Sequence, residues 1–194
     1  TFFNNLEHYA FFFALDAQCK KLHNKGCKEL LKEGEYKKIV NALLQKEGLN
    51  YGQLPKGLLL FHRYEDSVRT PAEEHLVEGA LYAKEADGTV NVHFTVSPEH
   101  RSLFEAHIKE NVPALEEKFG VKYNISFSEQ KSSTDTVAAT PNNEPFRLDD
   151  GSLLFRPAGH GALIENLNDI AADILFIKNI DNVVPDRLKP ETVH

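Results

Sequence analysis

The sequence predicts an α/β fold, in which helices flank a mostly parallel sheet. Short apolar runs alternate with helical patterns from residue 49 onward, as in strands that are joined by crossover helices. Residues 1–48 instead place apolar side chains at three- and four-residue spacing, which is typical of amphipathic helices. We therefore expect a helical segment over 1–48 and an α/β domain over 49–194, packed as one unit and without internal repeats.

The composition is that of an ordinary globular protein. Of 194 residues, 41% are hydrophobic and 26% are charged, which is enough for a core without disulfides or metals. The net charge of -7 disfavours a broad basic surface, so we expect no nucleic-acid partner. The two cysteines give no disulfide framework, and no apolar run reaches the ~20 residues that cross a bilayer. We expect a cytoplasmic protein without membrane contact.

Local signals place the elements in order. Gly26 and Gly34 divide the N-terminal helical pattern, and Gly48 ends it. An apolar strand is predicted over 58–61. Thr70, Pro71 and Glu73 then form a capping box with proline at the first helical position, which predicts a helix to about Ala83.

The remaining elements repeat the strand and helix alternation. Strands are predicted over 90–96 and 121–127. The helix between them is opened by Ser97-Pro98 and is interrupted or restarted at Pro113. Residues 128–150 are polar and predict a long loop. A strand over 153–155, a helix from about Gly161 and a strand over 174–177 complete the pattern.

Three polar segments follow predicted strands, where open α/β sheets bind ligands. They are the loop after Phe61, the turn Gly159-His160-Gly161 and the run Asn179-Ile180-Asp181-Asn182. Glycines permit positive φ and close approach, the following helix offers N–H groups to an anion, and Asp181 suits Mg²⁺ beside a phosphate. The alternative is that both motifs only form turns.

These residues also carry a resemblance. The runs RPAGHGALIENL and ADILFIKNIDNV resemble the segment of UDP-sugar pyrophosphorylases that meets nucleobase, ribose and metal, and LPKGLLLF resembles a strand of sugar nucleotidyltransferases. More closely, LPKGLLLFHRYEDSVRTP, EEHLVEGA and FSEQKSSTDT with the Gly-His-Gly run are similar to an uncharacterised bacterial domain-of-unknown-function family (number 4301), related to those enzymes. The close similarity covers most of 50–190.

The resemblance implies a nucleotide-diphospho-sugar transferase-like, Rossmann-like fold. It further implies a nucleotidyltransferase that joins a nucleoside triphosphate, with UTP favoured, to a sugar 1-phosphate and releases pyrophosphate. Lys56 and Asp181 would be catalytic, with Lys56 on a phosphate and Asp181 on Mg²⁺ or ribose. The nucleotide contacts would be Gly159, His160, Gly161, Gln130 and Asn179.

One departure from those enzymes concerns the triphosphate. They carry a Gly-x-Gly-Thr-Arg-Met-like loop upstream, and residues 1–55 contain none. Phosphoryl transfer depends on positioning and charge neutralisation, so we expect this chain by itself to be inactive. Because the chain has no Met, we expect the loop to precede Thr1 in a longer protein.

Three arginines are candidate contacts for a phosphate or sugar. Arg63 and Arg69 flank Glu65-Asp66 and could clamp a sugar phosphate in bidentate geometry, or could form surface pairs. Arg156 directly precedes the Gly-His-Gly turn and is the better placed candidate, although a solvated side chain is the alternative.

Two further clusters are weighed and disfavoured. Glu74 and Glu78 lie four positions apart beside His75; a solvated acidic face is favoured over a metal or acid–base site, because a third ligand is missing. The trio at positions 19, 23 and 27, Cys-His-Cys, could line a helix as zinc ligands, but Gly26 breaks that helix and no fourth ligand follows.

Two other function classes stay open. One is a non-catalytic domain that binds a nucleotide or nucleotide-sugar. The other is an interaction module in which the Phe-rich helices of residues 2–46 dock another chain. A homo-oligomer, or contact with a missing N-terminal part of the same protein, would fit either.

Overall fold

The structure is a computed structural model that describes residues 2–193, with only the backbone of His160 described. The described chain divides into two compact units. The first comprises residues up to Val90, Leu103–Tyr123 and the residues from Lys178 onward, and the second comprises Asn91–Ser102 and Asn124–Ile177.

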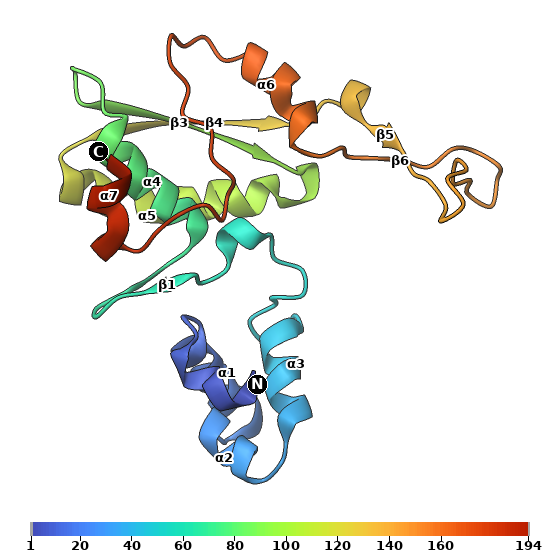
Figure 1. Cartoon of the computed structure of the whole chain (residues 1–194). Helices are drawn as coiled ribbons and strands as arrows, with labels where there is room; N and C mark the ends of the chain where they lie inside the picture. Colours follow the sequence, from blue (N-terminus) through green and yellow to red (C-terminus); the bar gives the residue numbers. More distant parts are fainter. Residues whose placement is uncertain (1, 194) are drawn as a thin grey trace. The chain divides into compact units, whose positions relative to one another are not determined.

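The N-terminal helices are short, as predicted. They are the 3-10 helix η1 (Phe3–His8) and the α-helices α1 (Phe12–His23), α2 (Cys27–Lys32) and α3 (Tyr36–Leu44), coloured blue in Figure 1. Leu15, Leu30 and Ile39 are fully buried and form their core together with Cys19 and Cys27. Asn24, with a φ of 56°, ends α1 in the left-handed conformation.

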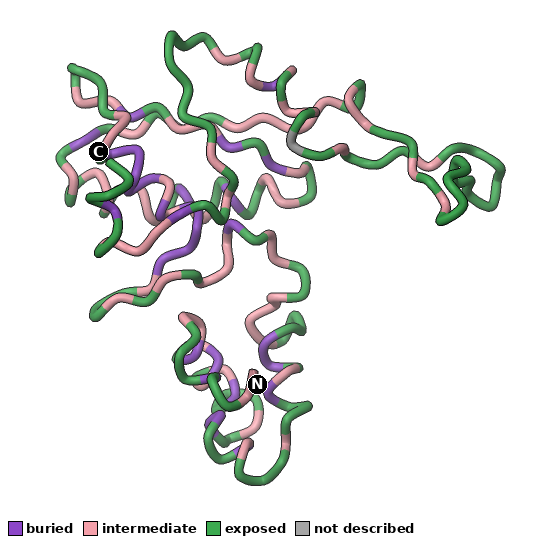
Figure 2. Tube along the Cα trace, in the orientation of Figure 1, coloured by how far each residue is buried: buried purple, intermediate pink, exposed green. Residues whose placement is uncertain are grey.

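Helix α4 (Pro71–Tyr82) begins at the predicted capping box. Thr70 Oγ1 accepts from the Glu73 amide at 3.3 Å, and the Thr70 amide donates to Glu73 Oε2 at 2.7 Å. Most of α4 is buried, as Figure 2 shows along this segment. Leu76 and Val77 supply its apolar contacts, and Ala83 ends it, as predicted.

The predicted strand over 58–61 is wrong. A 3-10 helix, η2 (Lys56–Leu58), precedes β1 (His62–Arg63), which pairs antiparallel with β2 (Val68–Arg69). The Leu60 amide donates to the Tyr51 hydroxyl and the Phe61 amide to the Arg69 carbonyl. The amides of this segment therefore bond to a side chain and to the β1–β2 hairpin. No neighbouring strand within residues 2–193 pairs with 58–61.

One parallel pair of strands is present within residues 2–193. Strand β3 (Thr89–Val96) pairs with β4 (Lys122–Glu129), and the chain between them forms η3 (Pro98–His100) and α5 (Arg101–Phe119). The predicted interruption of this helix is wrong: α5 continues through Pro113. A proline has no amide N–H, so it leaves the carbonyl four residues earlier without its helical hydrogen bond. Because Pro113 is exposed, water can donate a hydrogen bond to that carbonyl.

The fold is mixed α/β, but the expected extended parallel sheet is absent from residues 2–193. Their strands form three two-stranded sheets, and β3–β4 is the parallel one. Residues 174–177 are not a strand, and Ile174 and Ile177 are 76% and 68% exposed. An isolated apolar run adopts a strand when a neighbour pairs with it, and no strand within 2–193 does so.

The polar run expected as a loop joins the segment predicted as a strand over 153–155 in a small closed ring of three segments. Strand β5 (Thr136–Val137) pairs with β6 (Phe155–Arg156), and a middle segment bridges to both at Ala139↔Pro145 and Arg147↔Leu153. Ala138 N donates to Leu154 O at 2.8 Å, Leu154 N to Phe146 O at 3.1 Å, and Phe146 N to Ala138 O at 2.7 Å.

This ring has an internal repeat that the sequence analysis missed. Its three bonding residues, 138, 146 and 154, are evenly spaced, and the left-handed turn residues Asn143 and Gly151, with φ of 62° and 84°, are separated by the same interval. The repeated feature is a backbone pattern rather than a side-chain motif, which is why the sequence conceals it.

Short helices complete the described chain. They are η4 (Ser132–Thr134), η5 (His160–Leu163), α6 (Ile164–Asn168), η6 (Asp186–Leu188) and α7 (Lys189–Val193). Helix α6 begins close to the position predicted for a helix near Gly161. No helix among residues 2–193 has the length and apolar character needed to cross a membrane.

Candidate functional site

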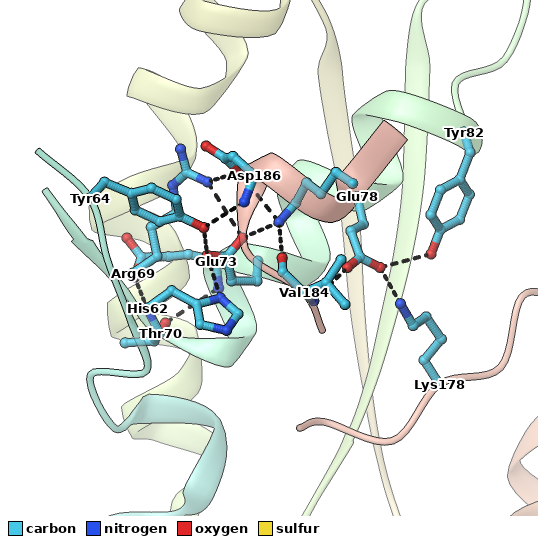
Figure 3. Close-up of polar contacts among 12 residues, drawn as sticks. His62, Tyr64, Arg69, Thr70, Glu73, Glu78, Tyr82, Lys178, Val184 and Asp186 are labelled. Carbon is cyan, nitrogen blue, oxygen red and sulfur yellow. Dashed lines mark hydrogen bonds and ion pairs between the residues drawn. The ribbon is translucent and has the colours of Figure 1, made fainter. Parts of the chain in front are cut away.

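Helix α4 directs two buried carboxylates toward the C-terminal segment. Glu74 is 0% and Glu78 is 1% exposed, so the expected solvated acidic face is wrong. Figure 3 shows the contacts around Glu78 and the neighbouring Asp186. The physical reason is that Lys178 and Lys189, far along the chain, fold over this face and compensate both charges.

Glu74 is surrounded by donors. Its Oε2 lies 2.6 Å from Lys189 Nζ and 3.4 Å from Arg69 Nη1, and its Oε1 lies 2.5 Å from the Tyr64 hydroxyl and 3.0 Å from His62 Nδ1. Burial, and then the hydrogen bond to Glu74, raise the pKa of Tyr64, so the phenol stays protonated and donates. A carboxylate with four donors is structural, because little of it remains for a substrate.

Arg69 is committed to the same network. Its Nη1 lies 2.7 Å from Asp186 Oδ1, and its guanidinium lies 4.3 Å from the centre of the Tyr64 ring. Burial alone would raise the pKa of Asp186, but the hydrogen bond and the charge of Arg69 leave it lowered. Arg69 was expected to contact phosphate; it is buried and engaged by two carboxylates.

The same helix fixes the 178–184 loop, the segment Lys178–Val184 that carries Asp181. The Glu78 carboxylate accepts from Lys178 Nζ at one end and from the Val184 amide, at 3.4 Å, at the other. Between them, His75 Nε2 lies 3.1 Å from the Ile180 carbonyl. Burial lowers the pKa of His75, so the ring is neutral, and because its partner can only accept, Nε2 carries the proton.

Lys56 and Asp181 meet at the surface of this fixed loop. Lys56 Nζ lies 2.5 Å from Asp181 Oδ2, although the residues are 125 positions apart, and the side chains are 59% and 41% exposed. Gly57 permits the approach: a Cβ there would lie 2.9 Å from Ile180 Cγ1 and 2.7 Å from Phe104 Cζ. The structure thus brings together the two residues for which the resemblance implies a catalytic role.

Asp181 fits Mg²⁺ as one ligand of several. No group of three or more His, Cys, Asp or Glu side chains within the described residues is arranged to hold a metal by itself. Mg²⁺ commonly keeps waters and takes one or two carboxylates beside substrate phosphates, so a single exposed carboxylate is compatible with it. Cys19 and Cys27 Sγ atoms lie 3.7 Å apart in the N-terminal core, and burial raises the pKa of both thiols.

The remaining sequence-predicted residues of the first unit contact other parts of that unit. Asn179 lies in the 178–184 loop, where its carbonyl accepts from the Asn182 amide at 2.9 Å. Arg63 Nη1 donates to the Glu7 carbonyl at 3.0 Å, and its guanidinium lies over the Phe13 ring. Arg63 therefore connects β1 to the N-terminal helices.

The other predicted residues belong to the second unit. Gln130 Nε2 lies 3.4 Å from Asp135 Oδ1, and Arg156 is an exposed residue of β6. Gly159 and Gly161 do not have positive φ, and a Cβ at either position would contact nothing within 4 Å, so their backbone does not require glycine. The side chain of His160 lies outside the described part of the chain.

Several residues of the site were missed by sequence reasoning. Four of them contact the glutamates of α4, namely His62, Tyr64, Lys178 and Lys189. The fifth, Asp186, contacts Arg69 and Lys189. Their sequence signal is weak. Only the capping box at Thr70, which marks the first turn of a helix rich in glutamate, points toward this region.

A comparison with protein-family models gives a match that extends over the whole chain. A family model described as a domain of unknown function (DUF4301) matches residues 1–194. Among curated proteins and among solved structures there is no significant match.

Proposed function

Since this chain belongs to the DUF4301 family of domains of unknown function, we propose its function from the site itself: it carries phosphate- and metal-contacting residues of a sugar-1-phosphate nucleotidyltransferase. Lys56 and Asp181 are the proposed functional pair. The supporting observation is their direct contact across 125 positions, at an exposed point of a loop that α4 holds at both ends.

The chemistry of the pair suits phosphoryl transfer. In the proposed reaction an oxygen of the sugar 1-phosphate attacks the α-phosphorus of a nucleoside triphosphate, with UTP favoured, and pyrophosphate leaves. The Lys56 ammonium would neutralise developing charge on a phosphate oxygen. A bound Mg²⁺ would supply further neutralisation, with Asp181 as its protein ligand.

Rigid positioning supports the same function. Electrostatic stabilisation of a transition state works best with charges that do not reorganise during the reaction. Glu78 and His75 hold the 178–184 loop before any ligand arrives, so Asp181 has a defined place relative to Lys56.

The test is a thermal-shift titration with UTP, ATP, UDP-sugars and inorganic phosphate, with and without Mg²⁺. A ligand at a hundred times its Kd stabilises the folded state by ~2.7 kcal/mol, so binding is readily seen. We expect a Mg²⁺-dependent shift with uridine nucleotides that is lost in Asp181→Ala and in Lys56→Ala. The exposed residues Asp66 and Lys37, each changed to Ala, are matched controls that should retain the shift.

The second candidate is a non-catalytic domain that binds a nucleotide or nucleotide-sugar. It is favoured by the absence of a glycine-rich triphosphate loop from residues 1–55. Binding of UDP-sugar together with no formation of UDP-sugar from UTP and sugar 1-phosphate would favour it. No shift with any nucleotide would reject both candidates for this chain.

A further inference from the structure

On one face of the parallel pair β3–β4, six consecutive positions carry neutral polar side chains, and Lys122, which begins β4 on the same face, pairs with Glu116. The six positions are Asn91, His93 and Thr95 of β3 and Asn124, Ser126 and Ser128 of β4. Parallel strands are normally covered by apolar side chains on both faces. A neutral face with hydrogen-bonding side chains on such a pair is therefore suited to contact with a polar ligand.

These side chains form a connected ladder. Asn124 Nδ2 donates to Asn91 Oδ1 at 2.7 Å, and His93 lies between two serines, with Nδ1 2.7 Å from Ser126 Oγ and Nε2 2.8 Å from Ser128 Oγ. Burial lowers the pKa of His93, so its ring is neutral. A neutral imidazole donates to one serine and accepts from the other, which orders both hydroxyl groups.

The carboxyl end of this face is closed by Asn166 of α6. Asn166 Nδ2 donates to Ser128 Oγ at 2.9 Å and to the Glu129 carbonyl at 2.8 Å. Because a carbonyl can only accept, this contact fixes which end of the amide is nitrogen. Asn166 is 3% exposed, and its Oδ1 has no hydrogen-bond partner among the described residues.

A buried acceptor such as Asn166 Oδ1 is expected to have a hydrogen-bond donor as its partner. Buried polar atoms are nearly always satisfied by protein, water or a ligand, and an unsatisfied one costs about 1–3 kcal/mol. Oδ1 is buried, whereas Ser126 and Thr95 on the same face are exposed. Hydrogen-bonding groups thus run from solvent to a buried acceptor at the strand ends, where α/β proteins bind ligands.

The composition of the face selects the ligand class. Its six neutral members offer no ammonium, guanidinium or carboxylate to match a phosphate or a cation, and no phenyl, phenol or indole ring on which a base could stack; Lys122 lies at the opposite end of β4 and is paired with Glu116. The six offer hydroxyl, amide and imidazole groups, which exchange hydrogen bonds with neutral hydroxyl groups. We propose that His93, Thr95, Ser128 and Asn166 form a site for a neutral sugar ring, with one sugar hydroxyl donating to Asn166 Oδ1.

This site shares no residue with the Lys56–Asp181 pair, which belongs to the other unit, and does not depend on the nucleotidyltransferase proposal. Neutral sugars bind weakly to such shallow faces, so the probe is saturation-transfer difference NMR with glucose, galactose and N-acetylglucosamine. Glucose 1-phosphate and inorganic phosphate serve as charged comparisons. We expect saturation of the ring protons of at least one neutral sugar by the unmodified protein.

Variants with matched controls test where the sugar binds. Thr95→Val and Ser128→Ala should weaken binding at least tenfold, while Thr136→Val and Ser132→Ala, at exposed positions of the same unit, should leave it unchanged. If Ser128→Ala fails to fold, Thr95→Val alone carries the test, because Thr95 is exposed. All four variants keep Lys56 and Asp181, so Mg²⁺-dependent UTP binding should be unaffected.

Three results would overturn the proposal. The first is no saturation of any neutral sugar, and the second is equal binding by Thr95→Val and by the unmodified protein. The third is binding of glucose 1-phosphate alone that disappears in Lys56→Ala, which would assign the sugar phosphate to the other site. Failure of UTP to bind, with sugar saturation intact, would instead reject the nucleotidyltransferase proposal.

Discussion

Glu74 Oε2 and Lys189 Nζ lie 2.6 Å apart with both side chains buried, although 115 positions separate them in the sequence. The pair joins α4 to the first residue of α7 and fixes the end of the C-terminal segment. Lys189 Nζ also donates to the Val184 carbonyl at 2.5 Å, so the same ammonium fixes the end of the 178–184 loop.

Removing one partner of this pair should be costly. Lys189→Met leaves a buried carboxylate without its nearest cation, and we expect the free energy of unfolding to fall by about 3 kcal/mol in urea denaturation. The double variant Glu74→Leu/Lys189→Met should lose less than the two single variants together. Lys21→Met, at an exposed position, is the control, and a Lys189→Met cost no larger than this control would contradict a buried ion pair.

Stability should fall on mild acidification because of His75. Burial lowers the pKa of His75 below its ordinary 6.5. Just below pH 6.5, His75 is therefore protonated in the unfolded chain and still neutral in the folded chain. This contribution to stability is complete above pH 6.5 and is lost as the pH falls toward the folded-state pKa. His75→Gln should therefore show a smaller loss of unfolding free energy between about pH 6.5 and 5.

The comparison for that experiment is His8→Gln, at an exposed position. His8→Gln should reproduce the slope of the unmodified protein. His93, whose pKa burial also lowers, supplies part of the remaining slope in both variants. An identical slope in His75→Gln and in the unmodified protein would show that His75 ionises equally in the folded and unfolded states.

The turn at Gly151 should depend on glycine, unlike the turn at Gly161. Gly151 has a φ of 84°, so Gly151→Ala strains the backbone although its Cβ would contact nothing within 4 Å. We expect a loss of about 1 kcal/mol. Gly161→Ala, with open space and no positive φ, should leave stability unchanged. Chemical denaturation of both variants checks this, and equal costs would refute the distinction.

The apolar run 174–177 should contribute little to stability. Ile177 is 68% exposed, so Ile177→Ala should cost less than about 1 kcal/mol, whereas Ile39→Ala, at a fully buried position, should cost about 2–5 kcal/mol. Urea denaturation of the two variants gives the comparison. A large cost at Ile177 would mean that this run is buried against another surface in solution.

Local signals in the sequence predicted local structure well. The capping box at Thr70 specified the start of α4 because cap, proline and glutamate act within one helical turn. The alternation over 90–96 likewise located β3. Pro113 misled the prediction because its effect depends on exposure, which a single sequence does not record.

Long-range contacts explain the rest. Glu74 and Glu78 resembled a solvated face because their partners Lys189 and Lys178 lie 115 and 100 positions away. The sequence did single out Lys56 and Asp181, through resemblance rather than through periodicity, and the structure places them in contact. Their proximity depends on the close approach at Gly57 and on the fixed position of the 178–184 loop. Neither feature could be derived from the spacing of residues in the sequence.

The ring of Ala138, Phe146 and Leu154 differs from an ordinary hairpin in how it can come apart. Each of the three residues donates one backbone hydrogen bond and accepts another, so displacing any one segment breaks two of the three bonds at once. Such a ring cannot fray from one end. Its three amides should therefore exchange with solvent deuterium at a common rate, as a single cooperative opening unit within a mostly exposed stretch of chain.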